Sequence, residues 1–68
     1  MAKTIQFWSN PQPIKQMILA NQEALAQIKA FAANKKEVAS VISQNLNLQV
    51  FNNGAFVKAV ATLVYEPN

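Results

Sequence analysis

The chain has 68 residues, a formal net charge of +3, 51% hydrophobic residues and 13% charged residues. This composition fits a single small folded domain over residues 1–68 and is too apolar for a disordered chain. There is no cysteine and no histidine, and Gly54 is the only glycine. Disulfides, the usual metal ligands, histidine catalysis and Gly-rich phosphate loops are therefore excluded, and we expect a protein that is not an enzyme and has no cofactor.

The first segment, residues 3–9, alternates in polarity and is rich in β-forming residues, which predicts a strand. Ile5 and Phe7 share one face of this strand, whereas Trp8 lies on the other face. Two prolines follow and end the strand, because neither can donate to a strand ladder. The second of them, Pro13, suits the first turn of a helix.

Residues 14–33 place apolar side chains at helical spacing, which predicts an α-helix about 30 Å long. The expected buried stripe consists of Ile14, Ile18, Leu25, Ile28 and Ala32, with Met17 and Phe31 beside it. Asn21 interrupts this stripe. It would either meet water at the rim of the stripe or fix the register of paired helices.

Asn34 favours a break, because asparagine suits both a left-handed helix end and an N-cap. A second short helix is then expected over residues 35–45, with Val38, Val41 and Ile42 buried. One long, slightly bent helix over residues 14–45 is the alternative.

Asn-Gly at positions 53–54 separates two β-like runs, and this dipeptide is typical of a two-residue type I′ hairpin turn. The expected cross-strand pairs are Asn52 with Ala55, Phe51 with Phe56, Val50 with Val57, Leu48 with Ala59 and Leu46 with Ala61. In this register one face is wholly apolar, and it continues to Leu63 and Tyr65. The competing interpretation extends the preceding helix through Phe51.

These elements predict an α+β fold of order β-α-(α)-β-β, with a helical layer on one face of a small three-stranded sheet that ends in a C-terminal hairpin. Parallel pairing of the first strand with the third would give the usual right-handed crossover, although the strand order stays open. No apolar stretch approaches the roughly 18 residues of a membrane span, and no signal peptide is visible. We expect no membrane contact and a cytoplasmic location, in a cell or, for a viral protein, in a host cell or virion.

The sheet face without helices is where we expect a partner. The predicted partner-binding residues are Trp8, Phe51, Phe56, Lys58 and Val60. This face is unusually apolar for a solvated sheet, and large exposed apolar patches mark interaction surfaces. The structural alternative is that the two phenylalanines only clamp the turn and that the tryptophan folds over a helix end.

A domain of this size gains about 3–5 kcal/mol from its own core, and disulfides and metals are excluded as further support. The sequence therefore predicts a non-enzymatic interaction module that self-associates or docks onto a larger assembly. A minor structural subunit of a virus particle and a small protein inhibitor both fit that description. The alternative is a single-stranded nucleic-acid-binding protein that uses sheet aromatics and lysines, although the absence of arginine and of a basic cluster disfavours it.

Overall fold

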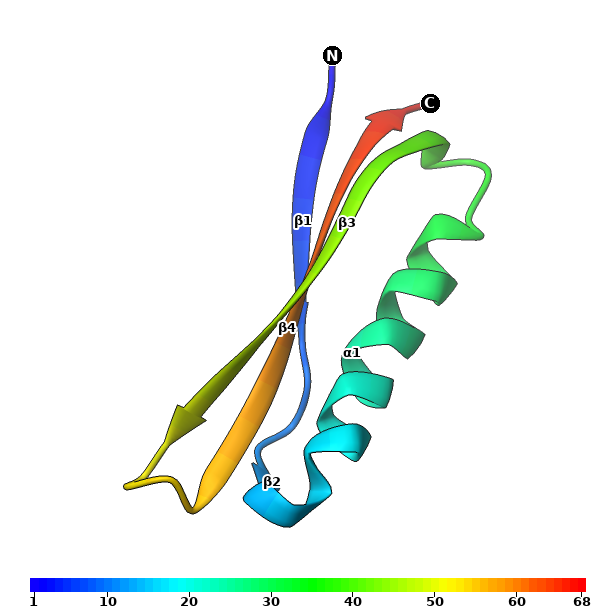
Figure 1. The fold of residues 1–68 in the computed structure, drawn as a ribbon. Coiled ribbons are helices and arrows are strands. Elements are labelled where there is room, and N and C mark those ends of the chain that lie inside the picture. The colour runs from blue at the N-terminus through cyan, green and yellow to red at the C-terminus, as the bar shows by residue number, and fades with distance from the viewer.

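The computed structural model describes all residues, 1–68, and places one α-helix on one face of an antiparallel sheet (Figure 1). Its elements are β1 (Lys3–Trp8), β2 (Gln12–Pro13), the 3₁₀ turn η1 (Ile14–Gln16), α1 (Met17–Ala32), β3 (Val38–Phe51) and β4 (Phe56–Pro67). The α+β class, the helical layer on one face and the C-terminal hairpin are confirmed. The short strand β2 is a fourth strand where three were expected. The helix is neither long nor apolar enough to cross a membrane.

The central strand is β4, which pairs with β3 along one side and with β1 and then β2 along the other. All of these pairings are antiparallel. The predicted parallel pairing of the first strand with the third, which corresponds to β4, is therefore wrong. The path of the chain explains the difference (Figure 1). The helix returns the chain to the end where β1 begins, so β3 runs in the direction of β1, and the hairpin then reverses β4 between them.

The hairpin has the register that the sequence predicts. The observed pairs include Phe51 with Phe56, Val50 with Val57, Leu48 with Ala59 and Leu46 with Ala61. Asn53 and Gly54 both have positive φ, and the N–H of Ala55 donates to the carbonyl of Asn52 at 3.1 Å, as a type I′ turn requires. Asn52 also has a φ of 54°, so the predicted pair of Asn52 with Ala55 is wrong: the strand ladder closes at Phe51 and Phe56, and residues 52–55 form a four-residue turn in place of the predicted two-residue one.

The predicted second helix over residues 35–45 is wrong, and so are the two longer-helix alternatives. Residues 35–37 form a turn, and β3 begins at Val38 and continues without interruption to Phe51. The helical spacing of Val38, Val41 and Ile42 is outweighed by pairing with β4, which β-branched side chains favour. Of these three residues only Val38 is buried.

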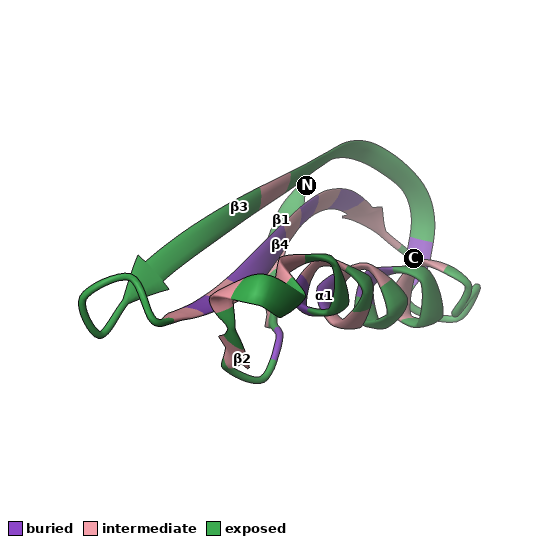
Figure 2. Ribbon diagram, turned by 60° about the horizontal axis from the view of Figure 1, so that its bottom comes forward, coloured by how far each residue is buried: buried purple, intermediate pink, exposed green.

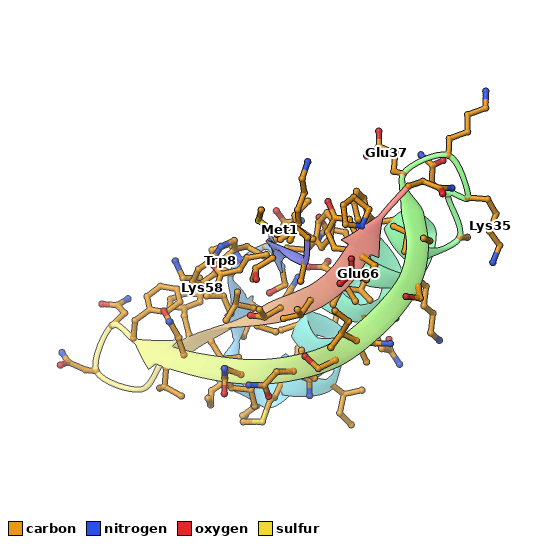
Figure 3. The ribbon with its side chains drawn as sticks, turned by 90° about the horizontal axis from the view of Figure 1, so that it is seen from above. Met1, Trp8, Lys35, Glu37, Lys58 and Glu66 are labelled. Carbon is orange, nitrogen blue, oxygen red and sulfur yellow. The ribbon has the colours of Figure 1, made fainter.

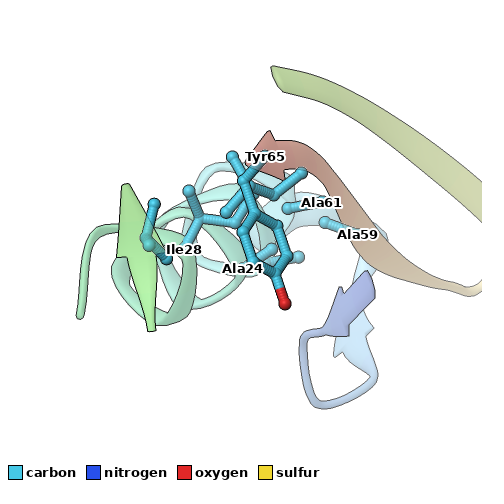
Figure 4. Packing of buried hydrophobic residues seen from close by; sticks show 8 residues of the cluster. Ala24, Ile28, Ala59, Ala61 and Tyr65 are labelled. Carbon is cyan, nitrogen blue, oxygen red and sulfur yellow. The ribbon is translucent and has the colours of Figure 1, made fainter. Parts of the chain in front are cut away.

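The core lies between α1 and β4 (Figure 4). Ala20, Ala24 and Ile28 are the buried residues of the helix, so the buried stripe is rotated from the predicted one, and Ile18 is 72% exposed. The alanines let the helix approach closely above Ala59 and similarly small side chains of β4. Two aromatic contacts extend the core, with ring centroids 5.6 Å apart for Phe7 and Phe31 and 5.1 Å apart for Phe31 and Tyr65.

Only the β4 half of the predicted apolar hairpin face is covered. Val57, Ala59, Ala61, Leu63 and Tyr65 are buried, whereas Leu46 is half-buried and Leu48 and Val50 are exposed. A single helix is narrower than the sheet, and α1 lies over the central strand. Figure 2 shows burial concentrated along β4, with β3 exposed along nearly its whole length.

Candidate functional site

The sheet face opposite α1, here called the open face, is formed by alternate residues of three strands. They are Thr4, Gln6 and Trp8 of β1, Ser43, Asn45, Asn47, Gln49 and Phe51 of β3, and Phe56, Lys58, Val60, Thr62 and Val64 of β4. Most of the β3 and β1 positions carry amides or hydroxyls. The large apolar side chains gather at the hairpin end of the face.

Four of the five predicted partner-binding residues form one group at that end, here called the aromatic cluster: Trp8, Phe51, Phe56 and Lys58. The Lys58 Nζ lies 4.8 Å from the centroid of the Trp8 ring and 5.8 Å from that of Phe51. The rings of Phe51 and Phe56 are stacked with centroids 6.0 Å apart. The cluster therefore joins three strands through one ammonium group and three rings (Figure 3 labels Trp8 and Lys58).

The strand register explains why these side chains meet. Phe51 lies directly opposite Phe56, next to the turn, and Trp8 lies opposite Val60. Lys58 stands between Phe56 and Val60 on the same face of β4, so both aromatic neighbours are its diagonal partners. Diagonal neighbours in a sheet are within reach of long side chains, and the lysine bridges from the central strand to both edges.

The position of Trp8 is fixed by the chain segment that follows it. The side-chain amide of Gln27 on α1 donates to the carbonyl of Trp8 at 2.8 Å. The next residue, Ser9, is buried and donates its backbone N–H to the carbonyl of Ala59 at 2.9 Å. Glu23 on the helix accepts from the N–H of Asn10 at 3.0 Å. The strand end that carries the tryptophan is thereby attached to both the helix and β4.

The fifth predicted residue, Val60, is only 4% exposed and offers little surface to a partner. Trp8 and Asn47 lie opposite it on the two neighbouring strands and shield it. By contrast, Trp8 is 42% exposed and Phe51 is 38% exposed. The stacking of Phe51 on Phe56 matches the turn-clamp alternative, but Trp8 lies beside Lys58 on the open face rather than over a helix end.

Charge on the open face is sparse. Along residues 56–64 of β4 and the positions that pair with them, Lys58 is the only charged residue. The surface has no pocket, and no three potential metal-ligating side chains come together. The chemistry that this face offers is therefore burial of aromatic rings and cation–π contact with one ammonium group.

A second exposed surface follows the outer edge of β3, and the sequence analysis missed it. Leu48 is 39% exposed and Val50 is 55% exposed, on the helix side of the sheet. The sequence carries a signal for this edge: residues 38–51 include no charged residue, no proline and no glycine, and residues 45–50 alternate strictly in polarity. Assigning residues 35–45 to a helix hid the length of this edge.

No family model, no curated protein and no solved structure matches this chain. Its function is therefore inferred from its own surfaces.

Proposed function

We propose that this chain is a non-enzymatic protein-interaction module whose open face is covered by another protein surface. The observation that carries the proposal is the aromatic cluster on the face that α1 leaves free, in which Lys58 lies over the rings of Trp8 and Phe51 and Phe56 stacks on Phe51. Trp8 and Phe51 are exposed and Phe56 is half-buried, and aromatic side chains of this kind are enriched in protein interfaces. Their burial against a partner releases about 25 cal/mol per Å² of apolar area.

The small core supports the same function. Only 11 of 68 residues are buried, and the exposed large hydrophobic residues include several on the sheet. A core of this size supplies about 3–5 kcal/mol, and the chain has no cysteine with which to add a disulfide. Burial of the exposed rings and aliphatic side chains against a partner is then the remaining source of stability for the fold. The partner surface belongs to a second copy of the chain or to a larger assembly, such as a virus particle or the target of a small inhibitor, in the cytoplasm.

Binding of single-stranded nucleic acid is the second candidate, since exposed rings beside a lysine can stack on unpaired bases. Such binding also needs a basic groove that follows the phosphates, and Lys58 stands alone on this face. Trp8 is the only tryptophan, so its fluorescence reports on the site directly. Quenching by an oligonucleotide at low salt that disappears steeply as salt rises would favour this function over protein binding.

Phe56→Glu tests the main proposal, because it places a carboxylate in the aromatic cluster next to the turn. Ala26→Glu introduces the same charge on the exposed side of α1 and serves as the control. Light scattering after size exclusion should give a smaller native mass for Phe56→Glu than for the wild type and for Ala26→Glu. Circular dichroism should show that both variants are folded. A mass for Phe56→Glu equal to that of the wild type contradicts self-association through the open face.

A further inference from the structure

We propose that residues 45–51, at the outer edge of β3, pair antiparallel with the same residues of a second copy of this chain. The strand has 14 residues and pairs only with β4, so its outer backbone groups have no partner strand. Such an edge is a template for pairing with another chain. The pairing is through the outer backbone edge of β3, which shares Phe51 with the open face, and it does not rest on the function proposed for that face.

The two edges of the sheet differ in how well they are protected. The β1–β2 edge is short and broken after Trp8, begins at Lys3 and ends at Pro13, which has no N–H to donate. Lysine, proline and short strands are the usual protection of an edge. The β3 edge has none of these features. Its register irregularities are confined to residues before 44, so residues 44–51 form a regular edge about 27 Å long at about 3.4 Å per residue.

Apolar side chains remain uncovered beside this edge within a single chain. Leu48 and Val50 point to the helix side of the sheet but lie beyond the cover that α1 provides. The helix turns Glu23 and Gln27 towards the β1–β2 side, where they bond to Asn10 and Trp8. Because an α-helix has 3.6 residues per turn, Ile18 lies on the flank of α1 opposite Glu23 and Gln27. Ile18 is 72% exposed, so this flank of the helix is also uncovered.

The strand is complementary to itself, which identifies a second copy as the occupant. A two-fold axis perpendicular to the sheet keeps each residue on its own face, so over residues 46–50 apolar side chains meet apolar ones and amides meet amides, whereas Asn45 meets Phe51 at either end. With Leu48 on the axis, the pairs are Leu48 with Leu48, Leu46 with Val50, and Asn47 with Gln49. The strand carries no charge, so two copies that are each +3 place no like charges opposite one another in this pairing.

Leu48→Lys tests this pairing, because an edge lysine opposes strand addition. Leu19→Lys is a matched control: Leu19 is 40% exposed, against 39% for Leu48, and lies on the far side of the helix from the sheet. Sedimentation equilibrium should give the wild type a native mass that is an even multiple of 7.5 kDa. Leu48→Lys should halve that mass, and Leu19→Lys should leave it unchanged.

Single-cysteine variants supply a second readout, since the chain has no cysteine of its own. Leu48→Cys should form a disulfide-linked dimer under mild oxidation, because a residue on the axis faces its own copy within bridging distance. Asn47→Cys should not, because its copy is a diagonal neighbour, about 7–8 Å away. Phe56→Glu added to Leu48→Cys should leave the disulfide yield unchanged, which separates this edge from the open face. A wild-type mass of 7.5 kDa, a Leu48→Lys mass equal to the wild type, or equal cross-linking at the two positions would overturn the pairing.

Discussion

Replacing Ser9 with alanine should destabilise the fold by about 1–3 kcal/mol, because it leaves a buried backbone donor without an acceptor. The Ser9 Oγ accepts a hydrogen bond from the N–H of Ala59 at 2.8 Å and donates one to the carbonyl of Asn10 at 3.0 Å. Ser9 is 6% exposed and Ala59 is fully buried, so water cannot take the place of the hydroxyl.

The size of this loss is large for so small a domain. A chain of this length has a free energy of unfolding of about 3–10 kcal/mol, at about 0.05–0.15 kcal/mol per residue. For such a domain each kcal/mol moves the Tm by about 4–8 °C. Ser9→Ala should therefore lower both the urea midpoint and the Tm clearly, while the far-ultraviolet circular dichroism of the folded state stays that of the wild type.

Ser43→Ala is the control for this measurement, because it makes the same change at an exposed position of β3. It should alter the free energy of unfolding by less than about 0.5 kcal/mol. All three proteins must be compared at one concentration, since association would add to the apparent stability. Equal stabilities for Ser9→Ala and Ser43→Ala would refute the role of the hydroxyl as the acceptor for β4.

Two further substitutions test the helix and the turn by urea denaturation. Asn21→Leu should raise the free energy of unfolding by about 1 kcal/mol, because the Oδ1 of Asn21 is buried without a hydrogen-bond partner and leucine is the better helix former. A loss of stability would show that the Asn21 amide has a hydrogen-bond partner in solution. Gly54→Ala should lower the free energy of unfolding by about 1–2 kcal/mol, because Gly54 has a φ of +84°, which a residue with a Cβ adopts only at a cost. A steric clash adds nothing to this loss, since a Cβ at this position meets no atom within 4 Å. An unchanged free energy of unfolding would mean that the turn does not hold this conformation.

The hairpin could be predicted from the sequence because several local signals agree there. Residues 53–54 favour positive φ at both turn positions. Only the register with Val50 opposite Val57 puts Leu46, Leu48 and Val50 on the same face as the apolar residues of β4 that they pair with. That register alone places Phe51, Phe56 and Lys58 on one face, whereas Trp8 joins them because β1 lies antiparallel beside β4, a pairing that the sequence did not reveal. What the register could not reveal is that Trp8 also shields Val60, because that depends on which strand lies opposite.

The segment from Val38 to Asn45 could not be assigned from its own residues. Its apolar spacing fits one face of a helix, and β4 decides the outcome by offering a long pairing partner. The rotation of α1 was likewise set by packing: Ala20 and Ala24 allow close approach to Ala59, which leaves the bulkier Ile18 in solvent. Both errors arise where a contact distant in sequence outweighs a local pattern.

Thermal unfolding of the wild-type chain over about a 100-fold range of concentration tests most directly whether a second copy covers these exposed surfaces. If it does, dilution towards the dissociation constant removes about 2–3 kcal/mol of stability, and the Tm should fall by about 10–20 °C across the range. A Tm that stays constant on dilution, with a native mass of 7.5 kDa throughout, would show that the chain is stable alone with its aromatic cluster and β3 edge in water.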